Sequence, residues 1–166
     1  MKTDTAKFSA IISPELSIVE FEPQHGKAFR DLNVAWITKS FWMEESDEIV
    51  LSNPEKHILE PGGSILLANY KNQIVGTCAL MYEGHGIYEL TKMAVDENLR
   101  GLKIGFHLGV CTLQKAKQLG ATKVILHSNT KGSAAAIQLY FKLGFREVPL
   151  GDAPWARADI KMEIDL

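Results

Sequence analysis

Glycine and basic residues occur together in the stretch NLRGLKIGFHLG, residues 98–109, between a strand-like segment and a segment with helical periodicity. The first N–H groups of a helix have no partner within it and lie at the positive end of its dipole, so a helix start can bind anions. Arg100 and Lys103 would add charge there. Gly101 and Gly105 would let a ligand approach the backbone. A phosphate site and an ordinary turn into a helix both fit this pattern.

The composition is that of one ordinary globular domain. The 166 residues suffice for a single core, and the net charge of -2 provides no basic field for nucleic acid or an anionic membrane. The longest apolar run near Met1 is too short for a secretion signal or a membrane span, so we expect a cytoplasmic protein.

The cysteine and histidine residues show no metal-binding pattern. Cys78 and Cys111 are expected to be buried apolar residues of a reducing compartment. The chain has no CxxC or HExxH motif and no Cys/His cluster at ligand spacing, so we expect no metal site. The scattered histidines are predicted to be structural rather than catalytic: His57, His85, His107 and His127.

Apolar periodicity and turn residues predict one α/β domain over residues 16–166 after an N-terminal lead-in, residues 1–15. The predicted order is β-α-α-β-β-β-α-β-α-β-β. Its elements are a strand at 16–22, helices at 23–41 and 54–60, a three-strand meander at 64–70, 73–83 and 87–95, a helix at 102–119, a strand at 123–129, a helix at 134–144, and closing strands at 145–148 and 158–166. Because a long helix separates the strands at 87–95 and 123–129, we expect a parallel crossover between them in a mixed, mostly antiparallel sheet flanked by helices.

Small residues recur along one face of the helix at 102–119. Gly105, Gly109, Thr112 and Ala116 follow one another at spacings of four, three and four residues. Such a stripe predicts that the helix lies close against the sheet.

Two further motifs accompany the glycine-containing stretch. The tripeptide MAV, residues 93–95, precedes RGLKIG by four residues, and Asn129 ends the next strand before AIQLYFKLGF, residues 136–145. In this order and spacing the segment 87–145 resembles the GCN5-related N-acetyltransferase (GNAT) superfamily. The segments YELTKMAV and RADIKME look like a bacterial subgroup whose substrates are generally unassigned.

The resemblance implies a single-domain GNAT fold with acetyl-CoA as co-substrate. The residues implied in its binding are Met93, Ala94 and Val95 through their main chain, Arg100, Gly101, Leu102, Lys103, Ile104 and Gly105 around the pyrophosphate, and Asn129, which could instead be a simple turn residue. The family motif Arg/Gln-x-x-Gly-x-Gly/Ala has its middle glycine replaced by Lys103. We expect Lys103 to adopt ordinary helical dihedrals and to donate to a phosphate.

The implied reaction is direct attack of an amine on a thioester, which needs a base, an oxyanion donor and a proton source for the thiolate. Glu89 is the candidate base, acting through water, and strand alternation would place it on one face with Thr91, Met93 and Val95. The alternative is a half-exposed carboxylate paired with Lys92 or Lys161. Tyr140 is the candidate acid; the alternative is an aromatic residue packed on the sheet. A backbone N–H near Met93, where two strands are expected to splay, is the candidate oxyanion donor.

The substrate side is less clear. Trp36 and Glu44 belong to WITKSFWMEESDE, an aromatic and acidic segment that would suit a cationic amine. The alternative is a core helix followed by a solvated acidic turn. Arg157 and Arg146 are candidates for contacts with an acceptor carboxylate, or are surface charges.

Three function classes follow. The first is an acetyl-CoA-dependent N-acetyltransferase acting on a primary amine of a small molecule or peptide, with no nucleic acid or membrane partner and with a homodimer as one candidate assembly. The second is a catalytically silent GNAT-fold domain that binds or senses acyl-CoA. The third, a nucleotide-binding Rossmann module, requires a GxGxxG motif after the first strand, which the chain lacks.

Overall fold

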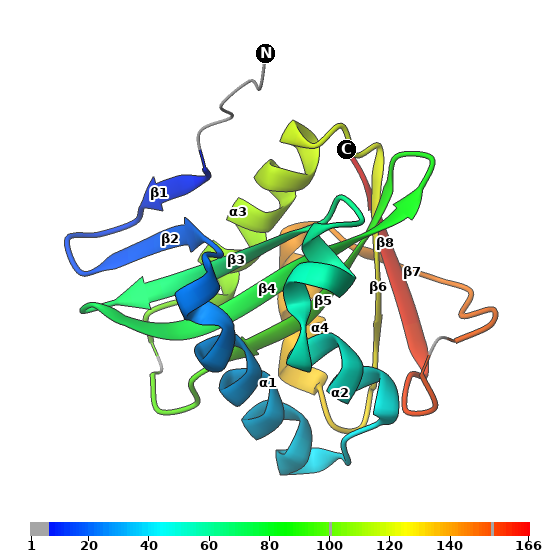
Figure 1. Cartoon of the computed structure of the whole chain (residues 1–166). Coiled ribbons are helices and arrows are strands. Elements are labelled where there is room, and N and C mark those ends of the chain that lie inside the picture. Colours follow the sequence, from blue (N-terminus) through cyan, green and yellow to red (C-terminus); the bar gives the residue numbers. More distant parts are fainter. Residues whose placement is uncertain (1–6, 100, 154) are drawn as a thin grey trace.

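The computed structural model describes residues 7–99, 101–153 and 155–166. Figure 1 shows an open, twisted sheet with helices on both faces. The strands are β1 (Ser9–Ile11), β2 (Leu16–Glu20), β3 (Ser64–Tyr70), β4 (Gln73–Gly84), β5 (Ile87–Val95), β6 (Lys123–Ser128), β7 (Arg146–Val148) and β8 (Ile160–Asp165). The helices are α1 (Gly26–Ser40), α2 (Glu45–Ser52), α3 (Ile104–Gln118) and α4 (Ala134–Leu143), with a 3-10 turn at Pro23–His25 and a π-helical turn at Glu55–Leu59.

The sheet order is β1-β2-β3-β4-β5-β6-β8-β7. The predicted meander is confirmed as β3-β4-β5, and the predicted crossover is confirmed as the parallel pair β5–β6, which α3 connects. Every other strand pair is antiparallel. The structure therefore confirms the mixed, mostly antiparallel α/β class.

Each face of the sheet has its own apolar core. Helices α3 and α4 cover one face, where Leu108 packs with Leu66 and Leu126. Helices α1 and α2 cover the other face, where Phe29 and Leu67 are fully buried.

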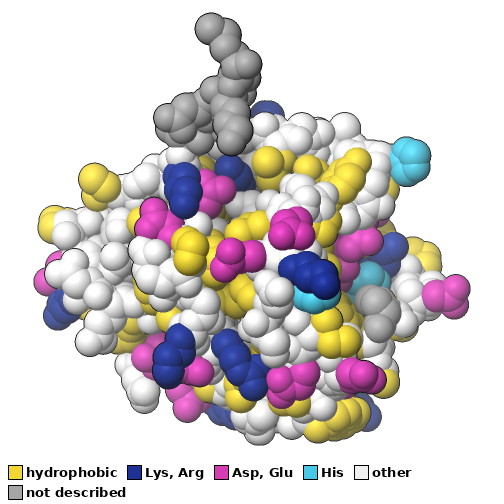
Figure 2. Space-filling model, in the orientation of Figure 1, with side chains coloured by type: hydrophobic (Ala, Val, Ile, Leu, Met, Phe, Trp, Pro, Cys, Tyr) yellow, Lys and Arg dark blue, Asp and Glu magenta, His cyan; other side chains and the backbone are white. Residues whose placement is uncertain are grey.

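On this second face Figure 2 shows basic and acidic side chains intermingled, without a continuous patch of one sign. Within the described residues, no helix is long and apolar enough to cross a membrane.

The lead-in predicted for residues 1–15 is partly wrong. Residues 9–11 form β1, which pairs antiparallel with β2, and Ala10 lies opposite Ile18. Phe8 and Ile12 pack against the core under this edge. Burial of these alternate apolar side chains makes the segment part of the sheet, whereas residues 1–6 lie outside the described part of the chain.

The prediction also missed α2, because the acidic segment before Asn53 was assigned no helix. Glu44 and Asp47 form a reciprocal capping box, in which the Glu44 N–H donates to Asp47 Oδ2 at 3.0 Å. Acidic residues in a first turn also suit the positive end of the helix. The helix predicted at 54–60 is a π-helical turn at Glu55–Leu59, and the Lys56 N–H donates to Asn53 Oδ1 at 3.2 Å.

The small-residue stripe of α3 lies against the sheet, as predicted, and also against α4. An added Cβ at Gly105 would lie 3.7 Å from Met93 Cε of β5 and 3.2 Å from Leu139 Cδ2 of α4. One at Gly109 would lie 2.4 Å from Leu143 Cδ1 of α4. The two glycines therefore also allow α3 to approach α4.

Candidate active site

Strand β5 contains a β-bulge at Lys92, whose φ of 51° is left-handed. Thr91 pairs with Ala79 of β4, whereas Ala94 pairs with Thr77, so two residues of β5 oppose one residue of β4. A bulge of this kind twists a strand and redirects the side chains that follow it. It interrupts β5 in the middle of the segment that was predicted to hold the reactive groups.

The bulge overturns the prediction that Glu89, Thr91, Met93 and Val95 share a face. Met93 and Val95 pack in the core under α3, within 4.0 Å of where a Cβ at Gly105 would lie. Glu89 pairs with Met81, which belongs to the core under α1 and α2. Because paired residues share a face, the extra residue has placed Glu89 and Met93 on opposite faces of the sheet.

A buried chain of hydrogen bonds joins the bulge to α1. Asn33 Nδ2 donates to Thr77 Oγ1 at 3.1 Å, and that hydroxyl donates to the Lys92 carbonyl at 3.0 Å. Asn33 Nδ2 also donates to the Phe29 carbonyl at 2.9 Å. Removing one member would leave a buried polar group without a partner. Asn33 is not among the residues predicted for the site, although it is a polar residue four positions from both Phe29 and Ile37 on a buried helix face.

Strands β5 and β6 separate after the bulge. They pair only over Ile87–Glu89 and Lys123–Ile125, while β6 continues to pair with β8 as far as Ser128. The edge of residues 90–95 that faces β6 is therefore not paired with it, and its main-chain polar groups are available to a ligand. The splay expected near Met93 is confirmed.

A cavity of about 90 Å³ lies in this opening. Trp36 and Phe41 line it from the α1 side, Tyr140 lines it from the α4 side, and Met93 and His127 come from the two strands. Because the lining comes from helices on opposite faces, the cavity passes through the sheet. Of the predicted residues it brings together Trp36, Met93, Asn129 and Tyr140, and it excludes Glu89 and Glu44 from its lining.

Glu89 and His127 form a buried pair beside the cavity. His127 Nδ1 lies 3.2 Å from Glu89 Oε1, and the side chains are 7% and 8% exposed. Burial, together with the nearby Glu83 carboxylate, raises the pKa of Glu89 to about 8. Burial, together with Lys161, lowers the pKa of His127. Glu89 is therefore not the half-exposed carboxylate paired with a lysine that the alternative interpretation expected.

Tyr140 and Ser133 contribute hydroxyl groups on the α4 side. Tyr140 packs edge-on to Phe145, with ring centroids 6.0 Å apart, and burial raises the pKa of its phenol. Ser133 lines the cavity, is 5% exposed, and its Oγ has no hydrogen-bond partner among the described residues. Ser133 is the N-cap residue of α4, but its side chain makes no capping hydrogen bond. A buried hydroxyl without a partner suggests that a ligand supplies one.

The start of α3 differs from its predicted geometry at Lys103. This residue has φ 55° and ψ 34°, which are left-handed, so the expectation of ordinary helical dihedrals is wrong. Gly101 is also left-handed, with φ 78°. The chain needs this turn to enter α3, and glycine would adopt it without strain. Lys103 therefore keeps the conformation suited to glycine and exposes its ammonium group at an uncapped helix start. Arg100 lies outside the described residues.

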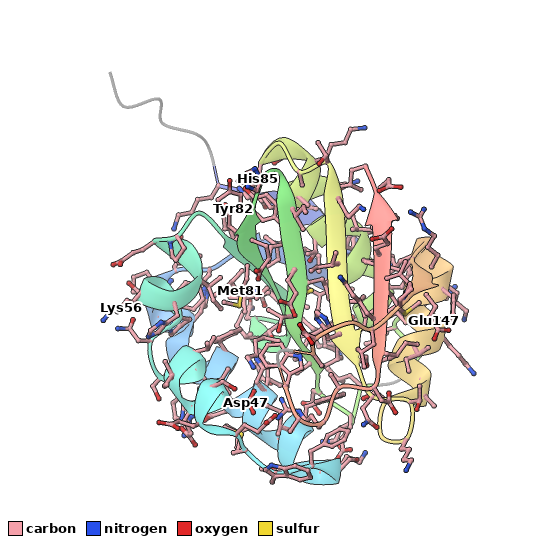
Figure 3. The ribbon with its side chains drawn as sticks, turned by 90° about the vertical axis from the view of Figure 1, so that its right-hand side faces the viewer. Asp47, Lys56, Met81, Tyr82, His85 and Glu147 are labelled. Carbon is pink, nitrogen blue, oxygen red and sulfur yellow. The ribbon has the colours of Figure 1, made fainter. Side chains whose placement is uncertain are left out.

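An ion network occupies the wall where the sequence suggested an acidic surface. Asp47, fully buried, accepts from Lys92 Nζ at 2.6 Å and from Arg157 Nη1 and Nη2 at 2.8 and 3.0 Å. Glu44 accepts from Arg157 Nη1 at 2.5 Å and from the Ala156 N–H at 3.3 Å. The negative charges of Asp47 and Glu44 are balanced by the positive charges of Lys92 and Arg157, so this wall carries no excess negative charge. In Figure 3, Asp47 lies at the end of the molecule opposite the β4–β5 turn.

The Asn129 side chain forms hydrogen bonds within and next to its own loop. Its Nδ2 donates to the Arg157 carbonyl at 2.6 Å, and its Oδ1 accepts from the Lys131 and Gly132 N–H groups at 2.9 and 3.0 Å. The turn-residue alternative is therefore correct for the side chain. Any contact of Asn129 with a ligand in the cavity would come from its main chain.

Comparisons with known proteins identify the fold and the family. A GNAT acetyltransferase from Staphylococcus aureus is 25% identical and superposes with a TM-score of 0.81 over 90% of this chain and 98% of its own. The protein yncA of Salmonella typhimurium, solved with acetyl-CoA, is 16% identical with a TM-score of 0.73 over 91% and 94% of the two chains. A Bacillus subtilis acetyltransferase in complex with CoA is 22% identical, with a TM-score of 0.69 over 92% and 99%. No curated protein matches the sequence.

The family model for the acetyltransferase (GNAT) family matches residues 26–145. The chain belongs to the GNAT family. It is therefore an N-acyltransferase, and the matched segment contains α1, the meander, α3 and α4.

Several features of this GNAT enzyme suit an acyl-CoA. The unpaired edge of residues 90–95 offers main-chain groups to an amide-containing arm, and Ser133 Oγ needs a partner at the same opening. The start of α3, with Lys103 exposed, presents N–H groups and a positive charge, a combination that suits anions. Within residues 7–99, 101–153 and 155–166, no cluster of three or more His, Cys, Asp or Glu residues is arranged to hold a metal.

Proposed function

We propose that this GNAT enzyme transfers an acetyl group from acetyl-CoA directly to the primary amine of a small molecule or peptide. The cavity that passes through the sheet carries this proposal. It places the unpaired backbone at Met93 between the Glu89–His127 pair on one face and Tyr140 on the other. A thioester held there could receive an amine from one side and release its thiol on the other.

The two faces supply different proton chemistry. On the α1 side, Glu89 is the candidate base that takes the amine proton through an intervening group, since it lies behind the cavity wall. On the α4 side, the raised pKa keeps the Tyr140 phenol protonated, so its hydroxyl can donate to the leaving sulfur. A main-chain N–H near Met93 would stabilise the oxyanion.

The cavity is small, at about 90 Å³, and we propose that it holds the reacting acetyl group and the amine of the acceptor. We propose that most of the acceptor molecule lies outside this cavity.

The acceptor wall is aromatic and, in net terms, neutral. Trp36, Phe41 and Trp155 line the cavity, and Arg157 contacts it while bound to Asp47. We propose that Trp36 contacts the acceptor directly. Glu44 would act indirectly, by holding Arg157 and the Ala156 backbone.

A thiol-release assay tests the function. Acetyl-CoA with a panel of small amines and N-terminal peptides should yield CoA thiol and a stoichiometric amount of acetylated amine. Binding of CoA without NAD binding would exclude the nucleotide-module alternative. Tight CoA binding with no transfer to any amine would instead favour the catalytically silent acyl-CoA sensor.

A further inference from the structure

His127 separates Glu89 from the cavity. Both side chains lie on the face of the sheet covered by α1 and α2, since Glu89 pairs with Met81 and with Ile125, which lies two residues before His127 on β6. His127 is part of the cavity lining and Glu89 is not. A group entering the cavity therefore meets the imidazole first, with the carboxylate 3.2 Å behind Nδ1.

This arrangement determines which imidazole nitrogen can act as a base. When Glu89 is ionised, Nδ1 donates its proton to the carboxylate, and the lone pair of the neutral ring is on Nε2. When Glu89 is protonated, its O–H donates to Nδ1, and Nε2 carries the ring proton. Only the first state offers a base to the cavity. The carboxylate thus selects the tautomer of the histidine.

We propose that His127, oriented by Glu89, is the general base that takes the amine proton during acyl transfer. The inference rests on the proposed N-acetyltransferase function and assigns to His127 the intervening role between Glu89 and the acceptor. In this step the amine nitrogen bonds to the thioester carbon, its N–H proton passes to Nε2 of His127, and the C–S bond breaks to release CoA thiolate. The Tyr140 hydroxyl donates its proton to the thiolate and regains a proton from solvent, and the imidazolium returns the amine proton to solvent.

Charged groups from three strands surround this pair. Glu83 of β4 disfavours ionisation of Glu89, whereas Lys92 of β5 and Lys161 of β8 favour it. On β6, His127 faces Lys161, which disfavours the imidazolium. Burial and Glu83 outweigh the two lysines and keep Glu89 protonated until the pH approaches about 8. The rate should therefore rise with pH as Glu89 ionises, in addition to any titration of the free amine.

The decisive experiment compares His127→Asn with His85→Asn. His85 lies at the β4–β5 turn, at the opposite end of the molecule from Asp47 in Figure 3, and it is exposed. With acetyl-CoA and an amine that the wild type accepts, we expect His127→Asn to lower kcat at least about 100-fold. The rise near pH 8 should disappear, and the KM for acetyl-CoA should stay within about twofold, since the substitution removes a base and not a CoA contact. His85→Asn should match the wild type.

Glu89→Gln provides a second test. It should lose the same rise near pH 8, because a neutral amide cannot ionise to select the tautomer. Histidine ¹⁵N spectra of the wild type should show the proton of His127 on Nδ1 above about pH 9, and on Nε2 well below pH 8. This measurement requires no enzymatic turnover, and because it uses the wild type it does not depend on the folding of a variant.

The outcomes separate the two proposals. Wild-type kcat and pH profile in a folded His127→Asn would overturn the role of His127 and leave the acetyltransferase function intact. An Nε2–H tautomer above pH 9 would do the same. If the wild type released no thiol with any amine, the proposed function would fail, and the role of His127 would fail with it.

Discussion

Arg157 binds Asp47 through two parallel hydrogen bonds, Nη1 to Oδ2 at 2.8 Å and Nη2 to Oδ1 at 3.0 Å. The contact joins α2 to the segment before β8, residues 110 positions apart in the chain. The same carboxylate accepts from Lys92 at the bulge, so one buried aspartate fixes both the bulge and the wall of the cavity. Trp155 covers this point, with its ring centre 5.1 Å from Lys92 Nζ.

Replacing Asp47 with Asn should destabilise the fold strongly. The change leaves the buried Lys92 ammonium and the Arg157 guanidinium without their common counter-charge, and breaking a buried pair costs about 3–5 kcal/mol. Urea unfolding at neutral pH measures the loss. The control Asp31→Asn removes an exposed carboxylate paired with Lys27 on α1 and should cost less than about 1 kcal/mol. Equal effects of the two changes would show that the network does not stabilise the fold.

The contribution of Asp47 should also depend on pH. Burial by itself would raise the pKa of Asp47, but hydrogen bonds from Arg157 and Lys92 outweigh it and hold the pKa well below its ordinary value of 3.8. The unfolded chain therefore takes up this proton first. Stability from Asp47 is fully present above pH 3.8 and is lost as the pH falls below it. The difference between wild type and Asp47→Asn should accordingly shrink as unfolding is measured at lower pH.

Glu89→Gln should stabilise the protein at alkaline pH. The folded carboxyl keeps its proton to about pH 8, whereas the unfolded one loses it near its ordinary value of 4.5. Wild-type stability therefore falls as the pH rises between these values, and the uncharged Gln variant avoids this loss. Thermal unfolding should show equal Tm values near pH 4 and a Tm higher by at least about 2–4 °C for Glu89→Gln at pH 9. Glu147→Gln, on the exposed strand β7, controls for loss of a carboxylate. A Tm difference independent of pH would contradict the prediction.

Lys103 tests backbone conformation and charge separately. Lys103→Gly should stabilise the fold by about 1 kcal/mol, because glycine adopts the left-handed conformation without steric cost. Lys103→Glu should keep the strain and reverse the charge, raising the KM for acetyl-CoA about tenfold or more, as expected for loss of a charged contact to phosphate. Urea unfolding and initial rates measure the two effects. An unchanged KM in Lys103→Glu would exclude the phosphate contact.

Gly132 should not tolerate a side chain. A Cβ at this position would lie 2.3 Å from Phe41 Cζ, so Gly132→Ala must displace the ring that lines the cavity. We expect a loss of about 1–3 kcal/mol, which Phe41→Leu in the same chain should largely restore. Gly26→Ala is the control, because a Cβ there meets nothing within 4 Å at a helical position. Additive effects of Gly132→Ala and Phe41→Leu would refute the clash.

Tyr140→Phe should slow transfer without unfolding the protein. Tyr140 lines the cavity, its ring keeps the edge-on contact with Phe145, and only the hydroxyl is lost. We expect kcat to fall about 100-fold with little change in the KM for acetyl-CoA. An acyl donor whose thiol is a better leaving group should reduce this loss of kcat. Wild-type kcat in Tyr140→Phe would remove Tyr140 from the mechanism.

The sequence by itself determined the family and the order of the elements except β1 and α2. Period-two and period-3.6 apolar patterns predicted β3-β4-β5, α3, β6 and α4 correctly, because burying one face of each element requires those patterns. Spacing of MAV, the glycine-containing stretch and LYFKLGF predicted the GNAT family, which the family model over residues 26–145 confirmed. Trp36, Met93 and Tyr140 were placed in one site before the fold was known, and all three line the cavity.

Only the tertiary structure decided which face each residue uses and which charges meet. Alternation predicted Glu89 and Met93 on one face, but the bulge depends on a hydrogen-bond chain from α1 that no local pattern encodes. The partners of Glu89 and Asp47 lie 38 and 110 residues away in the chain, at His127 and Arg157. Such pairs form because buried charges and polar groups need partners, and those partners are brought close by the folding of distant segments. The sequence therefore identified Glu89 and Tyr140 as candidates but not His127, which only the fold brings next to Glu89.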